Sequence, residues 1–125
     1  MSEAEALYQE GFGPRFAKSY RRYKSLHSRI DRIMAEVLAD PYLNSERLGK
    51  MPGGLDLRGC RSVRITRNFR LIFVVCEECR QIPECLYCFC EGWSSRTVIF
   101  LTVGPHTRAY ALRESAAEYE SDQGV

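Results

Sequence analysis

Five arginines recur at every third position near the middle of the chain: Arg58, Arg61, Arg64, Arg67 and Arg70. A planar guanidinium group can bind a phosphate through two parallel hydrogen bonds, so this series is suited to a phosphate-containing ligand. On an α-helix this spacing would gather the charges on one face, whereas a β-strand divides them between both faces. The chemistry of the series therefore depends on the element that carries it.

Alternating apolar residues predict that this stretch is a β-hairpin. Val63 and Ile65 share one face of a first strand, and Phe69 and Leu71 share one face of a second. All four meet on the same side of the sheet when Val63 lies opposite Leu71 and Ile65 lies opposite Phe69. This register leaves a short loop ending at Asn68, which tolerates the left-handed conformation that such loops need.

The same register sets Arg64 directly across from Arg70 on the other face of the hairpin. Like charges directly opposite each other are destabilising, and an anion bound between them would remove the repulsion. We therefore expect these two arginines to bind a phosphate. The alternative is that both extend into solvent or pair with carboxylates such as Glu46 or Asp56.

Five of the six cysteines lie in the stretch "CEECRQIPECLYCFC". Cys76 and Cys79 form one CxxC unit and Cys85 and Cys88 form another, and two such turns can complete a four-thiolate metal site. We expect these four residues to bind one structural zinc ion per chain, with Cys90 as a possible substitute for Cys88. An iron–sulfur cluster, a redox pair or free thiols are the alternatives.

His106 is one of only two histidines and follows a strongly apolar strand in "TVIFLTVGPHTRAY". A histidine at this point could act as a general acid or base near neutral pH. Tyr110 could stack on a base or orient a phosphate. A structural role for a histidine at a strand end is the alternative.

The charge distribution favours an anionic partner. The stretch from Phe12 to Val75 contains 14 Lys or Arg against five Asp or Glu, although the net charge of the chain is only +2. No run approaches the roughly 20 apolar residues of a membrane span. The acidic N-terminal stretch also lacks the features of a signal peptide, so we expect a cytoplasmic protein without a membrane partner.

The chain length indicates a single domain spanning residues 1–125. The apolar periodicity predicts two helices, over residues 13–26 and 27–40, and three strands, over residues 61–66, 68–75 and 97–104. Residues 41–59 form a predicted loop rich in Gly and Pro. The remaining segments are an N-terminal arm (1–11), a cysteine-rich insertion (76–96) and a C-terminal tail (113–125).

The order of these motifs resembles the RelE/ParE toxin superfamily. The segments "FGPRF", "ADPYLNSERL", "LRGCRSVRITRNFRLIFVV" and "TVIFLTVGPHTRAY" carry the resemblance. It covers roughly residues 12–112, apart from the cysteine-rich insertion. Within the superfamily the chain looks most like the ribosome-dependent mRNA interferases of the RelE, YafQ and YoeB type.

The resemblance implies a small α+β fold with two N-terminal helices packed on a twisted antiparallel sheet. The cysteine-rich segment would be a zinc-knuckle-like insertion between the last two strands. The resemblance also implies a type II toxin that cleaves mRNA in the ribosomal A site, without a catalytic metal. A cognate antitoxin would hold such a toxin inactive.

The resemblance further assigns roles to individual residues. His106 would be the general base or acid, Arg64 and Arg70 would clamp the scissile phosphate, and Tyr110 would hold the nucleotide. Further contacts with RNA or the ribosome would come from Arg61, Arg67, Asn68, Arg108 and Lys50.

Two other functions fit parts of the pattern. A ParE-like toxin would inhibit gyrase by binding, without hydrolysis. A non-catalytic, zinc-stabilised module that binds nucleic acid or protein would also use the arginine hairpin. The terminal His106 and Tyr110 favour the nuclease over the gyrase inhibitor.

Overall fold

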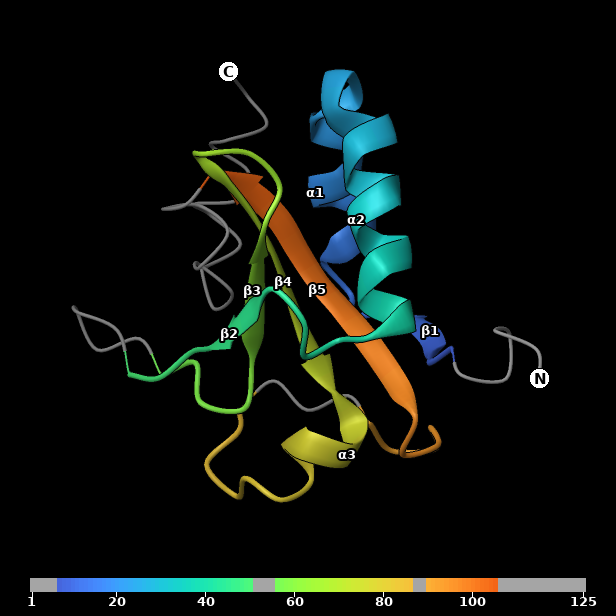
Figure 1. Ribbon diagram of the computed structural model, residues 1–125. Coiled ribbons are helices and arrows are strands. Elements are labelled where there is room, and N and C mark those ends of the chain that lie inside the picture. The colour runs from blue at the N-terminus through green and yellow to red at the C-terminus, as the bar shows by residue number, and fades with distance from the viewer. Residues whose placement is uncertain (1–6, 51–55, 87–89, 106–125) are drawn as a thin grey trace.

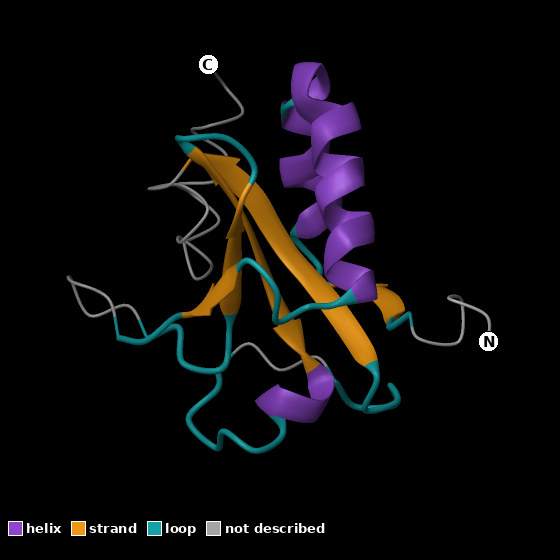
Figure 2. Cartoon of the chain, in the orientation of Figure 1, coloured by secondary structure: helices purple, strands orange, loops and turns teal. Residues whose placement is uncertain are grey.

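The computed structural model describes residues 7–50, 56–86 and 90–105. The two N-terminal helices lie along one face of a five-stranded sheet (Figures 1 and 2). No helix in these residues is long and apolar enough to cross a membrane. The elements, in chain order, are β1 (Gln9–Phe12), α1 (Phe16–Arg22), the 3-10 helix η2 (Lys24–Leu26), α2 (His27–Ala39), β2 (Ser45–Arg47), β3 (Arg61–Arg64), β4 (Phe69–Val75), α3 (Cys76–Cys79) and β5 (Thr97–Pro105).

The two predicted N-terminal helices are present. Helix α2 buries Ile30, Met34 and Val37, which recur at the three- and four-residue spacing of one helical face. The helix ends at Ala39, just before Pro41. Helix α1 is shorter than expected because η2 takes up the second part of the predicted segment. Both helices therefore contribute an apolar face to the sheet.

The prediction of a wholly antiparallel sheet is wrong. The strand order is β1-β5-β4-β3-β2, and β1 pairs with β5 in parallel. Strand β1 lies partly within the segment expected to be an N-terminal arm. At Gly11 an added Cβ would lie 3.2 Å from Ile99 Cδ1 and 3.2 Å from Trp93 Cζ2. The missing side chain therefore lets this short edge strand pack closely against its neighbours.

The segment predicted as a loop after α2 also contains a strand. Ser45, Glu46 and Arg47 form β2, which pairs antiparallel with β3. These three residues are polar and mostly exposed, so they lack the apolar alternation that identifies a strand in a sequence. Residues 45–47 are therefore a strand because they pair with β3, and their local sequence does not indicate one.

The predicted register of the arginine hairpin is confirmed. Val63 pairs with Leu71, and Arg64 pairs with Arg70. The expectation of a left-handed Asn68 is wrong, because Asn44 is the non-glycine residue with positive φ among the described residues. The loop closes instead through a hydrogen bond from the Phe69 amide to the Thr66 carbonyl, at 3.3 Å.

Both faces of the sheet are buried over part of their length. The helix side contains the larger aromatic core, with Phe73 and Phe100 fully buried. An irregularity in the pairing of β4 with β5, beside Ile72 and Phe73, lets Val103 join Phe100 on this side. The cysteine segment packs over the opposite face, with Cys60 and residues such as Ile72 beneath it. Among the described residues, none of the insertion packs over this second face at the end that carries the arginine hairpin.

Candidate functional site

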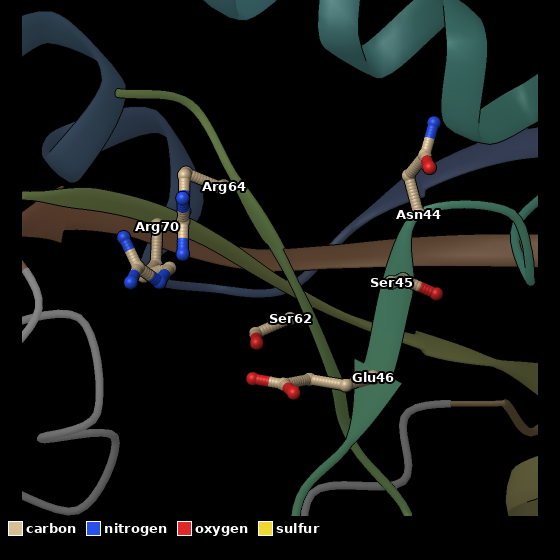
Figure 3. Close-up of a pocket in the computed structure, with 6 residues that line it drawn as sticks. All are labelled: Asn44, Ser45, Glu46, Ser62, Arg64 and Arg70. Carbon is tan, nitrogen blue, oxygen red and sulfur yellow. The ribbon is translucent and has the colours of Figure 1, made fainter. Parts of the chain in front are cut away.

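The open face of the sheet contains a pocket at its β2 edge. The pocket has a volume of about 350 Å³ and is lined by Asn44, Ser45, Glu46, Ser62, Arg64 and Arg70. These residues come from β2, β3 and β4 and from the residue just before β2. The hairpin register gathers them, since it turns alternate side chains of β3 and β4 to this face. Figure 3 shows the lining side chains.

The two facing arginines are held differently. Arg64 is exposed, and within the described residues no hydrogen bond or ion pair engages its guanidinium group. Arg70 donates from Nη1 to the carbonyls of Thr66 at 3.3 Å, Arg67 at 3.0 Å and Phe69 at 3.2 Å. Arg70 therefore fixes the hairpin loop with one nitrogen and can present the others to a ligand. Arg64 is the freer anion-binding group of the two.

Glu46 is the site residue that the sequence did not assign to the chemistry. It was expected, at most, to neutralise the hairpin arginines. Its side chain extends into the pocket on the side of Ser62, while Arg64 and Arg70 lie along the other side (Figure 3). The ion pairs among the described residues do not join it to either arginine. A carboxylate and two guanidinium groups thus share one open pocket.

The alternative partner for the arginines, Asp56, is occupied elsewhere. Arg58 donates to both of its carboxylate oxygens, at 2.8 and 2.6 Å. This hydrogen bonding holds the pKa of Asp56 down at about 2. Asp56 is therefore bound to the first arginine of the series and is unavailable to Arg64 and Arg70.

Arg61, one of the predicted RNA-binding residues, has a structural role in the fold. Its Nε donates to Glu78 Oε1 at 3.0 Å and its Nη1 to Ser45 Oγ at 3.0 Å. The guanidinium group also lies 4.8 Å from the ring centroid of Tyr42. The side chain is only 12% exposed. Arg61 therefore joins β3 to helix α3 and the β2 edge.

Replacement of Glu78 by alanine is expected to lower the free energy of unfolding by about 3 kcal/mol. The largely buried guanidinium group of Arg61 would lose its carboxylate partner. The Glu78 side chain is 8% exposed and bridges Arg61 to Arg47, 3.0 Å from each. Urea denaturation measures the change. Glu36→Ala is the matched control, because Glu36 forms an exposed pair at 4.0 Å and its loss should cost less than about 0.5 kcal/mol. Equal losses in the two variants would contradict the structural role of Glu78.

The other predicted contact residues that the structure describes are not among the residues that line the pocket. Arg67 and Asn68 are exposed at the hairpin tip. Lys50 is exposed and forms an isolated bridge with Asp56, away from the pocket-lining set. Contacts of these residues with RNA remain predictions.

His106, Arg108 and Tyr110 lie outside the described residues, so their catalytic and binding roles remain predictions. The strand that leads to them is described. Gly104 pairs with Arg70 and Pro105 pairs with Phe69. Strand β5 therefore ends beside the arginine hairpin.

The cysteine segment lies at the other end of the sheet from the pocket (Figure 1). Cys76, Cys79 and Cys90 are buried, and Cys85 is partly buried. Cys79 Sγ lies 3.5 Å from Cys90 Sγ. In the described ranges no group of three His, Cys, Asp or Glu side chains is placed to hold a metal ion. The zinc site stays a prediction, since its proposed ligand Cys88 is not among the described residues.

No family model matches this chain, and no curated protein matches it. Solved structures do match. The YoeB/ParE toxin from Agrobacterium tumefaciens superposes with a TM-score of 0.54 at 15% identity, over 78% of this chain and 98% of that one. This chain has the RelE/ParE-type toxin fold.

Two solved toxin–antitoxin complexes match this chain to a similar degree. The RelBE2 complex from Mycobacterium tuberculosis matches with a TM-score of 0.54 at 16% identity, over 80% of this chain and 99% of that one. The DinJ–YafQ complex from E. coli matches with a TM-score of 0.52 at 11% identity, over 82% and 96%. Nearly the whole length of each solved chain is therefore matched, and this chain has residues beyond the shared fold.

Proposed function

We propose that this protein is the toxin of a type II toxin–antitoxin pair and that it cleaves mRNA on the ribosome. The observation that carries the proposal is the open pocket in which Arg64 and Arg70 face each other across the hairpin with Glu46 nearby. This pocket lies on a fold similar to that of the YoeB, RelE and YafQ toxins. Two arginines placed to bind a phosphate at this position suit a nuclease.

The phosphate would bind between the two arginines. Cleavage of RNA by the neighbouring 2′-hydroxyl builds negative charge on the phosphorane, and preorganised cations stabilise it. Arg64 supplies a guanidinium group that no described residue engages, and Arg70 supplies one that its hydrogen bonds to the loop hold in place. The repulsion between the two side chains is relieved when the anion binds.

Proton transfer needs a base for the 2′-hydroxyl and an acid for the leaving 5′-oxygen. Glu46 is the carboxylate in the pocket and is suited to accept the proton. His106, the residue after the end of β5, would then donate a proton to the leaving group, and Tyr110 would hold the nucleotide. This division of roles extends the sequence-based assignment, in which His106 could serve as base or acid. The mechanism requires no catalytic metal.

A cognate antitoxin is the proposed regulatory partner. The matched structures include complexes named as toxin with antitoxin, from Mycobacterium tuberculosis and E. coli. An antitoxin that contacts the pocket would hold this protein inactive. We further propose that the toxin acts in the cytoplasm, where its mRNA substrate is translated.

Expression of the protein alone in translating cells tests the proposed function. Mapping of transcript 5′ ends should reveal new ends within coding regions for the wild type and far fewer for Glu46→Gln. Intact transcripts together with a DNA-damage response would instead support gyrase inhibition. Growth with neither effect would favour a non-catalytic binding module.

A further inference from the structure

We propose that the hydroxyl group of Ser62 is a third phosphate-binding group of the pocket and donates a hydrogen bond to a non-bridging oxygen of the scissile phosphate. The inference rests on the proposed function, because it takes the ligand of the pocket to be an RNA phosphate. Ser62 belongs neither to the arginine series nor to any motif that the sequence singles out. Its role follows from its place in the sheet and from its burial.

Ser62 lies at the centre of the pocket-lining set. It is in β3, two residues before Arg64, so the two side chains project from the same face of the strand. It pairs with Glu46 of β2 on one side and with Ile72 of β4 on the other. Arg70 pairs with Arg64 and is therefore a diagonal neighbour of Ser62. Figure 3 shows the Ser62 side chain directed toward the Glu46 side of the pocket.

Ser62 combines deep burial with a hydroxyl group that has no protein partner among the described residues. Its exposed fraction is 2%. The buried polar side chains of the described ranges are Ser62, Thr97 and Thr102, and of these Ser62 is the one that lines the pocket. A buried hydroxyl group is usually hydrogen-bonded, because leaving it unpaired is unfavourable. A ligand that enters the pocket would supply the missing partner.

Other hydroxyl groups in comparable positions already have partners within the protein. Ser45 also lines the pocket, and its Oγ donates to the carbonyl of Pro41 at 2.7 Å. The buried Thr97 has its Oγ1 at 3.1 Å from Ser94 Oγ. The fold satisfies these hydroxyl groups internally, whereas that of Ser62 is left for a group from outside the described chain.

The donors in the pocket define the kind of ligand atom that Ser62 can bind. A guanidinium group has only donors, so a ligand held by Arg64 and Arg70 must present acceptor atoms. The non-bridging oxygens of a phosphodiester are charged acceptors, and a hydroxyl group beside them donates. Hydrogen bonds to a charged oxygen are stronger than those between neutral groups. The contribution of Ser62 should therefore grow as charge builds on the phosphorane.

The place of Ser62 beside Glu46 also gives it a positional role. An ionised carboxylate only accepts hydrogen bonds, so Glu46 suits the 2′-hydroxyl and not the phosphate oxygens. Ser62 lies between this carboxylate and the two arginines along the face of the sheet. A phosphate held there by Ser62 would have its phosphorus next to the 2′-oxygen that attacks it.

The test uses the purified full chain and a dinucleotide with one phosphodiester and a methoxy group in place of the attacking 2′-hydroxyl, which cannot be cleaved. NMR titration measures its affinity. Ser62→Ala should bind the dinucleotide about tenfold more weakly than the wild type, the effect of one hydrogen bond to a charged group. The urea midpoint of Ser62→Ala should equal or exceed that of the wild type, because the change removes a hydroxyl that the free protein leaves unpaired.

Ser19→Ala is the matched control, because the Ser19 hydroxyl has a structural role away from the pocket. Its Oγ donates to the carbonyl of Phe16 at 2.9 Å and accepts from the amide of Val103 at 3.2 Å. Ser19→Ala should therefore show the opposite pattern, with a lower urea midpoint and wild-type affinity for the dinucleotide.

A phosphorothioate version of the dinucleotide identifies the atom that Ser62 binds. Sulfur in place of one non-bridging oxygen should weaken binding to the wild type for one of the two diastereomers. The same substitution should weaken binding to Ser62→Ala less, since the hydrogen bond is already absent and the two losses are not additive.

The results separate this inference from the proposed function. Wild-type affinity in Ser62→Ala, or a fall in its urea midpoint as large as that of Ser19→Ala, would overturn the role of Ser62 even if the protein cleaves mRNA. Loss of affinity with an unchanged urea midpoint would support it. That support would hold for phosphate binding even if the wild type left mRNA on the ribosome uncut, in which case the nuclease proposal alone would fail.

Discussion

Replacement of Arg64 by alanine is expected to lower the rate of mRNA cleavage by about 10²- to 10³-fold, the typical effect of removing one preorganised group that stabilises charge in a transition state. Arg64 is exposed, and no described residue engages its guanidinium group, so the change should leave the fold intact. Cleavage rates on ribosomes, measured by primer extension, give the effect. Circular dichroism verifies the fold of the variant.

Two further variants separate charge at the site from charge on the surface. Arg64→Lys keeps the charge and loses the bidentate fork, so it should fall between the wild type and Arg64→Ala. Arg32→Ala removes an arginine that is 65% exposed on α2 and should cleave at the wild-type rate. If Arg64→Ala cleaves as fast as Arg32→Ala, Arg64 does not bind the scissile phosphate.

Replacement of Phe73 by alanine is expected to reduce the free energy of unfolding by about 4 kcal/mol, as is typical for deletion of a fully buried aromatic ring. Phe73 lies in β4 with 0% exposure, and its ring centroid lies 6.2 Å from that of Phe100. The ring fills the core between the sheet and the helices, so its removal leaves a cavity. Urea denaturation of the purified variant measures the loss.

Leu43→Ala serves as the matched control for this cavity. Leu43 is 63% exposed, so its truncation should change the free energy of unfolding by less than about 0.5 kcal/mol. A loss for Phe73→Ala as small as that for Leu43→Ala would show that the helix-side core contributes little to stability.

The arginine hairpin was predictable from sequence because its apolar residues alternate. Pairing Val63 with Leu71 puts both on the same buried face, which a slip of one residue would not do, and this register also sets Arg64 opposite Arg70. Helix α2 was predictable for a similar reason, since its apolar residues recur at helical spacing. In both cases the local pattern and the tertiary packing agree.

The two edge strands could not be predicted, because their residues carry no such pattern. Strand β2 is short and polar, and it forms only because β3 offers it backbone partners. Because β2 was not predicted, Glu46 was not recognised as a pocket residue. Its position in the pocket depends on its pairing with Ser62. Recognition of residues 45–47 as a strand would have placed this carboxylate on the face of Arg64.

The position of Cys60 was also hidden in the sequence. It stands apart from the other five cysteines, so residue spacing does not predict that it packs with them. The turn at Gly59 and the folding of the insertion over the sheet place it in one buried cluster with Cys76, Cys79 and Cys90. Contacts of this kind depend on packing between distant segments, which residue spacing cannot predict.

The most direct test of the proposed function is an in vitro reaction of the purified protein with ribosomes stalled on a defined mRNA. The 5′ ends of the products are mapped by primer extension, with the same mRNA free of ribosomes as the comparison. We predict a cut within the A-site codon that requires the ribosome and is lost in Arg64→Ala. Uncut mRNA in the presence of folded wild-type protein, or equal cutting of ribosome-free mRNA, would contradict a ribosome-dependent nuclease.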